Sequence, residues 1–425
     1  MKVIVIGAGI GGLATALSLH AAGITDVTIY EAVGELRPLG VGINLLPHAV
    51  RELTELGLGG ALAELGVPTS TLSYVNCFGQ SIWSEPRGIA AGYAWPQYSV
   101  HRGRLQLLLA DAVDARLPGA IVLDCAATAT TAHSGRQFVQ ISSRDGGERT
   151  EGADVVIAAD GIHSAIREQR YPHQGAPVWN GLTLWRGTAR VRPYLDGRTM
   201  FMAGDGRQKF VAYPLSEPGD DGLALINFIA EKRVGGESGV NDWMRSVDKQ
   251  RIADMFADWR FDWIDIPALI DSADELLEYP MVDRDPVERW TFDRQTLLGD
   301  AAHPMYPIGS NGASQAIIDA RTIAYQLATA GSIDDALAEY ERLRRPSTAS
   351  LTLSNRSLGP ERVMQMAYER APDGFTDILD VISLDELTEI ADQYKRAAGF
   401  NPRLLNERPT LSVLNSPHER QGNSP

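Results

Sequence analysis

Short apolar runs separated by glycines predict the first elements of the chain. Residues 3–6 and 27–30 have the pattern of strands, and a helical pattern lies between them. The run at 153–160 is expected for a strand buried on both faces of a parallel sheet, and 296–299 predicts one more short buried strand. Helical spacing of leucines predicts a helix at 102–116. This order of strands and helices predicts an α/β fold.

Two further stretches predict antiparallel strands. Residues 71–100 hold Trp and Tyr with Gly and Pro between them, which is typical of short strands, and 182–191, 210–215 and 223–229 suggest longer ones. Because Trp and Tyr concentrate in both stretches, we expect one inserted sheet domain made of residues 71–100 and 176–280. Helices are expected at 361–400, followed by a loose polar tail at 401–425.

Composition narrows the classes of partner. The 425 residues carry a net charge of −15, which disfavours nucleic acids and anionic membranes. Two cysteines in a chain of this size suggest a reducing compartment, the cytoplasm. The first strand leaves no room for a signal peptide, and no run of about 18 apolar residues appears, so we expect no membrane span.

The first strand–helix turn carries a dinucleotide-binding pattern. Gly7 allows a tight turn, Gly9 lets the backbone approach a pyrophosphate at the helix N-terminus, and Gly12 allows close helix–strand packing. Glu31 ends the second strand, where it can accept hydrogen bonds from a ribose. The strand, helix, second strand and acid occur in the expected order. The alternative is a glycine-rich turn in another kind of α/β protein.

Two other strand ends carry an acid beside a glycine. Asp160 and Gly161 follow the buried strand and form a turn, which a capped strand–helix connection would also explain. Asp300 follows the strand at 296–299, and the glycine-rich loop at 307–316 opens a helix whose backbone N–H groups favour an electron-rich ligand edge. An ordinary glycine-rich loop is the alternative. Arg102 begins a helix and could pair with a pyrophosphate or be a surface arginine.

These motifs, in this order, resemble the single-component (group A) FAD-dependent aromatic monooxygenases with the para-hydroxybenzoate hydroxylase-like fold. The resemblance runs from residue 1 to about 346 and includes the string at 340–346. Strings at 37–44, 83–88, 279–286 and 311–316 are similar to a subgroup of the family that hydroxylates phenazines. Residues 190–260 match less well, and substrate contacts are expected there.

The resemblance implies a Rossmann-like FAD-binding domain made of residues 1–70, 101–175 and 281–360. It also implies that the inserted antiparallel sheet domain binds the substrate. The residues implied to bind FAD are Gly7, Gly9, Gly12, Glu31, Gly42, Arg102, Asp160, Asp300, Gly312 and Ala313. Asp160 is further implicated in NAD(P)H binding, and Pro307 aligns with a loop proline whose carbonyl lies near the substrate.

By the same resemblance, NADH or NADPH reduces FAD, and reduced flavin and O2 form a C4a-hydroperoxide that hydroxylates an aromatic or heteroaromatic molecule such as a phenazine, quinolone or salicylate. The cofactor supplies this chemistry, so no metal cluster is expected. His303 is a candidate for a direct catalytic part, with a structural loop residue as the alternative. Trp185 and Tyr213 are candidates to line the substrate pocket, although ordinary sheet packing would explain both. We expect a monomer or homodimer.

Two other functions have the same nucleotide-binding fold. Flavin halogenases carry a Trp-x-Trp-x-Ile-Pro string, and residues 259–267 resemble it with different spacing and with Phe261 in place of the first Trp. A non-catalytic binding protein on this fold, similar to the Rab-escort proteins, is the other alternative. The intact Gly-Asp loop argues against it.

Overall fold

The computed structural model describes residues 1–38, 40–234, 245–399 and 401–413. One of its two large sheets has six strands: β1 (Val3–Ile6), β2 (Val27–Tyr30), β8 (Ile121–Val122), β12 (Val155–Ala158), β21 (Thr291–Phe292) and β22 (Gln295–Leu297). Their order is β21-β22-β12-β1-β2-β8, and all neighbours are parallel except β21 and β22. The predicted α/β class is confirmed.

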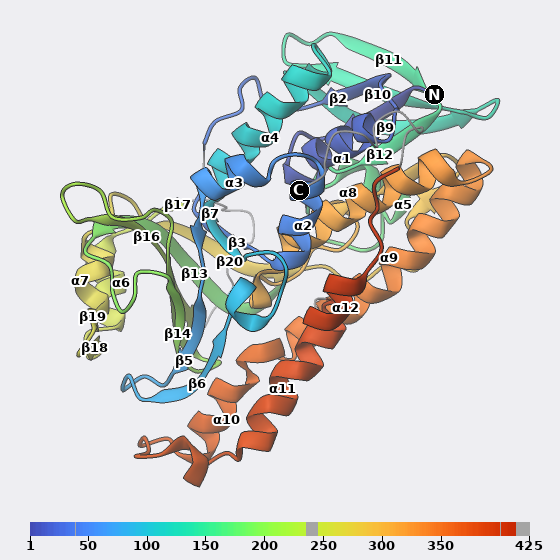
Figure 1. The fold of residues 1–425 in the computed structure, drawn as a ribbon. Coiled ribbons are helices and arrows are strands. Elements are labelled where there is room, and N and C mark those ends of the chain that lie inside the picture. The colour runs from blue at the N-terminus through green and yellow to red at the C-terminus, as the bar shows by residue number, and fades with distance from the viewer. Residues whose placement is uncertain (39, 235–244, 400, 414–425) are drawn as a thin grey trace.

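Helices and a small second sheet pack against this parallel sheet and share one apolar core with it. The helices are α1 (Ile10–Ala21), α2 (Pro47–Glu55), α3 (Gly59–Leu65), α4 (Arg102–Arg116), α5 (Ala165–Arg170), α8 (Gly312–Thr329) and α9 (Ile333–Arg356). The small antiparallel sheet consists of β9 (Cys125–His133), β10 (Arg136–Ser143) and β11 (Glu148–Ala153), which lie at the top of Figure 1. No element was predicted from the sequence for β9–β11.

The inserted sheet has eight strands and lies beside the domain built on the six-stranded sheet (Figure 1). Its members are β5 (Thr71–Val75), β6 (Ser81–Pro86), β13 (Val178–Val191), β14 (Thr199–Gly204), β15 (Gln208–Pro214), β16 (Ala224–Arg233), β17 (Arg245–Ser246) and β20 (Leu277–Asp283). The order is β17-β20-β13-β16-β15-β14-β5-β6. Only β5 and β14 pair in parallel, so the two stretches predicted from aromatic content join in one sheet.

The two faces of this sheet bury different clusters, because side chains alternate along a strand. On one face, Trp185 packs with α6 (Lys249–Met255) and α7 (Ile266–Asp271). On the other face, Leu184 belongs to a cluster that includes residues of α10 (Arg362–Arg370) and α11 (Leu384–Ala397). The second face is the one that borders the cavity described below.

The limits of the sheet differ slightly from the expected 71–100 and 176–280. Strand β7 (Tyr98–His101) pairs with β3 (Gly42–Leu45) and β4 (Val67–Pro68) in a separate sheet, and β20 carries the eight-stranded sheet on to Asp283. Residues 235–244 of the expected insert lie outside the described residues.

The expected loose tail is wrong for residues 401–413. Pro402–Glu407 form helix α12, and Leu405 is 2% exposed. The guanidinium of Arg51 donates to the carbonyls of Leu405 and Arg408, at 2.9 and 2.7 Å. A buried arginine therefore binds this segment to helix α2, and an apolar side chain anchors it. Residues 414–425 of the expected tail lie outside the described residues. Within the described ranges, no helix is long and apolar enough to span a bilayer.

Candidate active site

The glycines of the first turn lie close to neighbouring backbone. Gly7 has a φ of +97°, which is left-handed, and a Cβ there would lie 2.6 Å from the carbonyl oxygen of Ala159. A Cβ on Gly12 would lie 1.9 Å from the carbonyl oxygen of Gly7. Gly9 faces open space, since no atom lies within 4 Å of a Cβ added there. Helix α1 thus begins beside β1 with room for a phosphate at its N-terminus.

A cleft of about 600 Å³ begins at this turn and is lined by Gly7, Gly9, Glu31, Arg102 and Asp160 among others. Glu31 is held at the end of β2, where its carboxylate accepts from the backbone N–H groups of Ala8 and Val33, at 2.7 and 3.0 Å. Arg102 is the first residue of α4. It directly follows His101, which pairs with Gly42 of β3. The structure therefore brings these five predicted residues together around one cleft.

A second cavity of about 200 Å³ lies between the domain of the six-stranded sheet and the eight-stranded sheet. Six predicted site residues line it: Gly42, Tyr213, Asp300, Pro307, Gly312 and Ala313. The backbone N–H of Gly42 donates to Asn227 Oδ1 at 2.7 Å. A Cβ on Gly42 would lie 2.6 Å from the ring of Tyr213, so glycine is needed where β3 meets the sheet. Four methionines also line this cavity: Met200, Met202, Met281 and Met305.

Two carboxylates at these cavities are suited to accept hydrogen bonds from ligand hydroxyls. Asp160 Oδ1 is buried without a hydrogen-bond partner among the described residues. Burial raises the pKa of Asp160 and that of Asp300. Asp300 is exposed to the space of the cavity that it lines, and protein atoms surround it on its other sides. The unpartnered oxygen Oδ1 of Asp160, the carboxylate of Asp300 and the open helix start beside Gly9 fit the ribose, pyrophosphate and ribityl groups of FAD.

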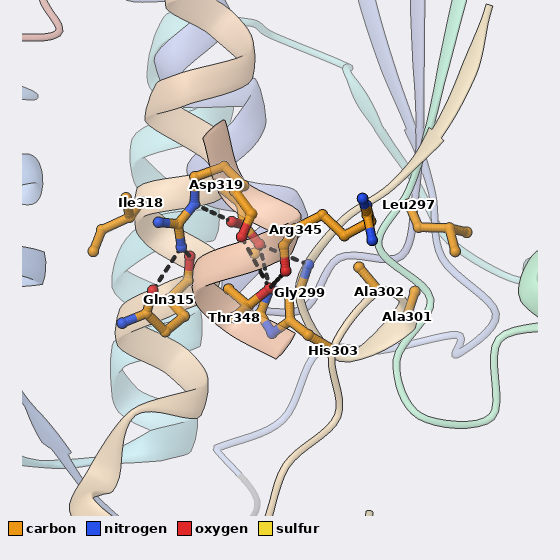
Figure 2. Close-up of polar contacts among 12 residues, drawn as sticks. Leu297, Gly299, Ala301, Ala302, His303, Gln315, Ile318, Asp319, Arg345 and Thr348 are labelled. Atoms are coloured by element: carbon orange, nitrogen blue, oxygen red, sulfur yellow. Dashed lines mark hydrogen bonds and ion pairs between the residues drawn. The ribbon is translucent and has the colours of Figure 1, made fainter. Parts of the chain in front are cut away.

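His303 does not line either of these two cavities. Its ring Nε2 lies 2.5 Å from Asp319 Oδ2, and its side chain is buried, as Figure 2 shows. Asp319 also accepts from Gly299 N at 3.2 Å and from Arg344 Nε at 2.7 Å. Although burial disfavours its charge, His303 and Arg344 lower the pKa of Asp319 to about 2. This placement favours the structural alternative for His303, whose contact with Asp319 joins the loop after Asp300 to helix α8.

The expected pocket position of Trp185 is also wrong. Trp185 is fully buried on the sheet face that packs against α6 and α7, and its ring N–H donates to Glu278 at 2.8 Å. Leu184 and Arg186, one residue away on either side, line the cavity instead. The halogenase-like string at 259–267 also lies on this face, because Trp259 and Trp263 pack in the same cluster as Trp185, away from the cavity.

Arg186 was not selected from the sequence, yet it lines both the cleft and the cavity. Its Nε has no hydrogen-bond partner among the described residues, and its guanidinium lies 5.7 Å from the ring centroid of Tyr279. Burial lowers the pKa of Arg186, and Arg102 acts in the same direction. The sequence contains no pattern that marks Arg186, because only the register of the sheet places it where the cleft meets the cavity.

A cleft that begins at a dinucleotide-binding turn and adjoins a second cavity is typical of flavoprotein oxidoreductases, which bind a second molecule beside the cofactor. The comparisons agree with this class. The family model described as "FAD binding domain" matches residues 1–178 and 260–354, more than half of the chain. The chain therefore belongs to this family, and it is a FAD-dependent monooxygenase, an enzyme that uses NADH or NADPH and O2.

Similar proteins include the phenazine 1,6-dicarboxylic acid hydroxylase PhzS of Lysobacter antibioticus, 43% identical over 83% of this chain and 89% of that protein. Salicylate hydroxylase of Pseudomonas putida is 28% identical over 96% of this chain and 90% of that protein. Among solved structures, a salicylate hydroxylase substrate complex superposes with a TM-score of 0.72 at 22% identity, covering 97% of this chain and 99% of the other. At that identity the superposition shows the fold alone.

Proposed function

We propose that this enzyme hydroxylates a planar aromatic or heteroaromatic molecule of the phenazine, quinolone or salicylate type. The observation that carries the proposal is the meeting of the nucleotide cleft and the apolar cavity at Arg186. Support also comes from the relative that acts on a phenazine dicarboxylic acid. A molecule in the cavity would lie beside Gly42, Gly312 and Ala313, where the cofactor ring is expected.

The chain's own residues would hold the cofactor in the following way. Residues at the first turn would receive the pyrophosphate, with Arg102 as its counter-charge, and Glu31 would accept from the ribose. Asp160 and Asp300 would accept from hydroxyl groups along the cofactor. Bound FAD would supply the redox chemistry: it would be reduced by NAD(P)H and would activate O2 for transfer to the aromatic ring of the substrate.

The cavity would select an aromatic substrate in two ways: by excluding water and through the positive charge of Arg186. Methionine side chains are flexible and polarisable, and they make favourable contacts with aromatic rings. Arg186 forms no ion pair with a described residue, so an acidic group on the guest would be its natural partner. Tyr213 would contact the guest from the sheet, and Pro307 from the loop before α8.

The test is a screen of the purified holoenzyme with phenazine-1-carboxylate, a hydroxyquinolone and salicylate. We expect at least one of them to stimulate NAD(P)H oxidation and to give a product one oxygen atom heavier, with the label when 18O2 is supplied. Comparison of NADH with NADPH assigns the donor. Stimulated oxidation that yields only peroxide with every aromatic would overturn the hydroxylase proposal.

Cofactor assignment is tested by variants with a matched control. Glu31→Ala and Asp300→Ala should purify with less FAD, because each removes an acceptor for a cofactor hydroxyl. Glu64→Ala, an exposed change on α3, should retain a full complement. Flavin absorbance relative to protein absorbance is the readout. Wild-type FAD affinity in both site variants would refute the assigned residues.

Other features of the proposal concern the organisation of the chain. We take residues 1–70, 101–175 and 281–360 as the FAD-binding domain and the eight-stranded sheet with its helices as the substrate domain. A cytoplasmic location is supported by the free thiols of Cys77 and Cys125. A monomer or homodimer without nucleic acid is expected, and light scattering coupled to gel filtration would decide between the two.

A further inference from the structure

Three charged side chains form a buried cluster on the cavity face of the eight-stranded sheet. Lys209 of β15 and Glu231 of β16 are directly opposed in the antiparallel register. The ammonium of Lys209 lies 3.2 Å from Glu231 and also contacts Glu361, the last residue of the 3-10 turn η4 (Gly359–Glu361). Each of the three side chains is only 6% exposed. Two carboxylates therefore share one ammonium away from bulk water.

The charge balance of this cluster leaves room for one more proton. With all three groups ionised, the cluster would carry one excess negative charge in a buried place, which is unfavourable. Burial raises the pKa of Glu231; Lys209 opposes this shift, Glu361 adds to it, and Arg233 opposes it. Although burial disfavours its charge, Lys209 keeps a raised pKa because of the two carboxylates. Arg186 lines the same cavity, and the charges of Arg186 and Glu231 interact without forming an ion pair. Of the two carboxylates, only Glu231 lines both the cavity and the neighbouring cleft, so its position makes it the group that can bind and release a proton.

The cluster separates two spaces. Lys209, Glu231 and Glu361 line the 200 Å³ cavity. Lys209 and Glu231 also line an outer cleft of about 270 Å³, together with Arg233 and Arg356. One carboxyl group thus borders both the cavity in which the aromatic is expected and a cleft on its other side.

The cluster also lies outside the residues that the family model matches. Lys209 and Glu231 lie between the two matched segments, and Glu361 lies beyond the second one, which ends at 354. Buried ion clusters contribute little to stability compared with apolar packing of the same volume. A cluster in this position is consequently better explained by what it does for the molecule in the cavity.

We propose that Glu231 carries a proton between the aromatic in the cavity and water in the outer cleft, with Lys209 holding the carboxylate between the two spaces. The proposal rests on the proposed hydroxylase function. Among the compounds of the screen it favours the hydroxyquinolone and salicylate, which carry an ionisable hydroxyl or ring N–H, over phenazine-1-carboxylate, which has neither. Removing that proton makes the ring more electron-rich before oxygen is transferred. Lys209 and Glu361 act as positioning residues.

The proton transfer is balanced without a further reactant. The O–H or N–H bond of the aromatic breaks, and its electron pair stays on that oxygen or nitrogen. The proton forms an O–H bond with Glu231, and this bond later breaks as the proton passes to water in the outer cleft. No group is oxidised or reduced in these steps.

The test follows proton release on binding, in the oxidised holoenzyme without NAD(P)H, so that no turnover occurs. The probe is 1-hydroxyphenazine, mixed in a stopped-flow instrument with a pH-indicator dye in weak buffer. We expect about one proton per molecule bound in the wild type, and release slowed about 100-fold or more in Glu231→Gln, as for loss of a general base. The ligand control is 1-methoxyphenazine, which should bind without release.

The protein controls separate a relay from a general effect of removing a glutamate. Glu217→Gln removes an exposed carboxylate of the same domain, whose side chain is 53% exposed, and should behave as the wild type. Glu361→Gln should shift the midpoint of proton release to lower pH, because its negative charge raises the pKa of Glu231. If Glu231→Gln does not fold, Glu231→Asp should fold and retain release at a reduced rate.

The possible failures are distinct. If 1-hydroxyphenazine binds and Glu231→Gln releases its proton at the wild-type rate, the relay is wrong and the hydroxylase function stands. If neither 1-hydroxyphenazine nor any aromatic of the screen perturbs the flavin spectrum of the wild type, the proposed function itself fails, and the relay with it.

Discussion

Replacing Asp319 by Asn should destabilise the protein, because it removes the anion that two buried groups share. Asp319 is fully buried on α8 and accepts from His303 and the backbone of Gly299 (Figure 2). It also accepts from Arg344. An asparagine has the same shape but leaves the side chain of Arg344, itself 11% exposed, without its carboxylate. Removal of one partner from a buried ion pair costs about 3–5 kcal/mol.

The expected size can be stated as a change in melting temperature. Unfolding entropy is about 2.1 cal/mol/K per residue, which gives about 0.9 kcal/mol/K for 425 residues. A loss of about 3–5 kcal/mol then lowers Tm by roughly 3–6 °C. Differential scanning calorimetry of the apoprotein at pH 7 measures it. The matched control is Asp334→Asn, whose side chain is 68% exposed beside Arg294 and should change Tm by less than about 1 °C.

The pH dependence gives an independent check on the same carboxylate. The pKa of Asp319 is about 2 in the folded protein, below the ordinary 3.8, so the folded state binds the proton less tightly than the unfolded state. This stabilisation, about 2 kcal/mol, is fully present above pH ~4 and is lost as the pH falls through ~2. The gap in Tm between the wild type and Asp319→Asn should therefore narrow on acidification. An unchanged Tm at pH 7, or a gap that does not depend on pH, would refute the reasoning.

Further predictions concern the first turn and the two faces of the eight-stranded sheet. Gly12→Ala should abolish FAD binding or folding, because its Cβ would lie 1.9 Å from the oxygen of Gly7, whereas Gly60→Ala, with no atom within 4 Å, should retain flavin absorbance. Tyr213→Ala should raise KM for the aromatic about 10-fold, through a loss of about 1–2 kcal/mol of apolar contact. Trp185→Phe should leave KM unchanged and lower the unfolding free energy by about 1–3 kcal/mol, since it loses a buried hydrogen bond on the other face. Equal effects on KM from these last two variants would contradict the assignment of faces.

The nucleotide-binding part could be predicted from sequence because its determinants are local. Gly7, Gly9 and Gly12 act through their own backbone, and Glu31 follows the strand whose end it occupies. Strands β1 and β12 are continuous apolar runs, which few other structures explain. The family resemblance supplied the cofactor, and the family match confirms it.

Prediction failed where a side chain's role depends on register or on distant partners. Trp185 and Arg186 are adjacent, and only the pairing of β13 with β16 and β20 decides which of them faces the cavity. His303 lies three residues after Asp300, but its partner Asp319 is on α8. Strands β9–β11 were missed because β10 and β11 are largely polar and β9 consists mainly of alanine and threonine, with only one side of β10 buried.

The polar composition of residues 401–413 predicts a tail, but the contact that orders this segment comes from Arg51, more than 350 residues earlier. Composition reports the average environment of a segment and carries no information on such a partner.

By itself, the sequence determined the glycine turns, the buried strands and the acids at their ends, because each depends on a few neighbouring residues. The tertiary structure alone decided which face of the inserted sheet meets the cofactor domain, and so which of two adjacent residues meets the ligand. It also brought Lys209, Glu231 and Glu361 together across two strands and a distant turn. The physical reason is that side-chain direction alternates with every residue, while the pairing that sets it is made between segments far apart in the chain.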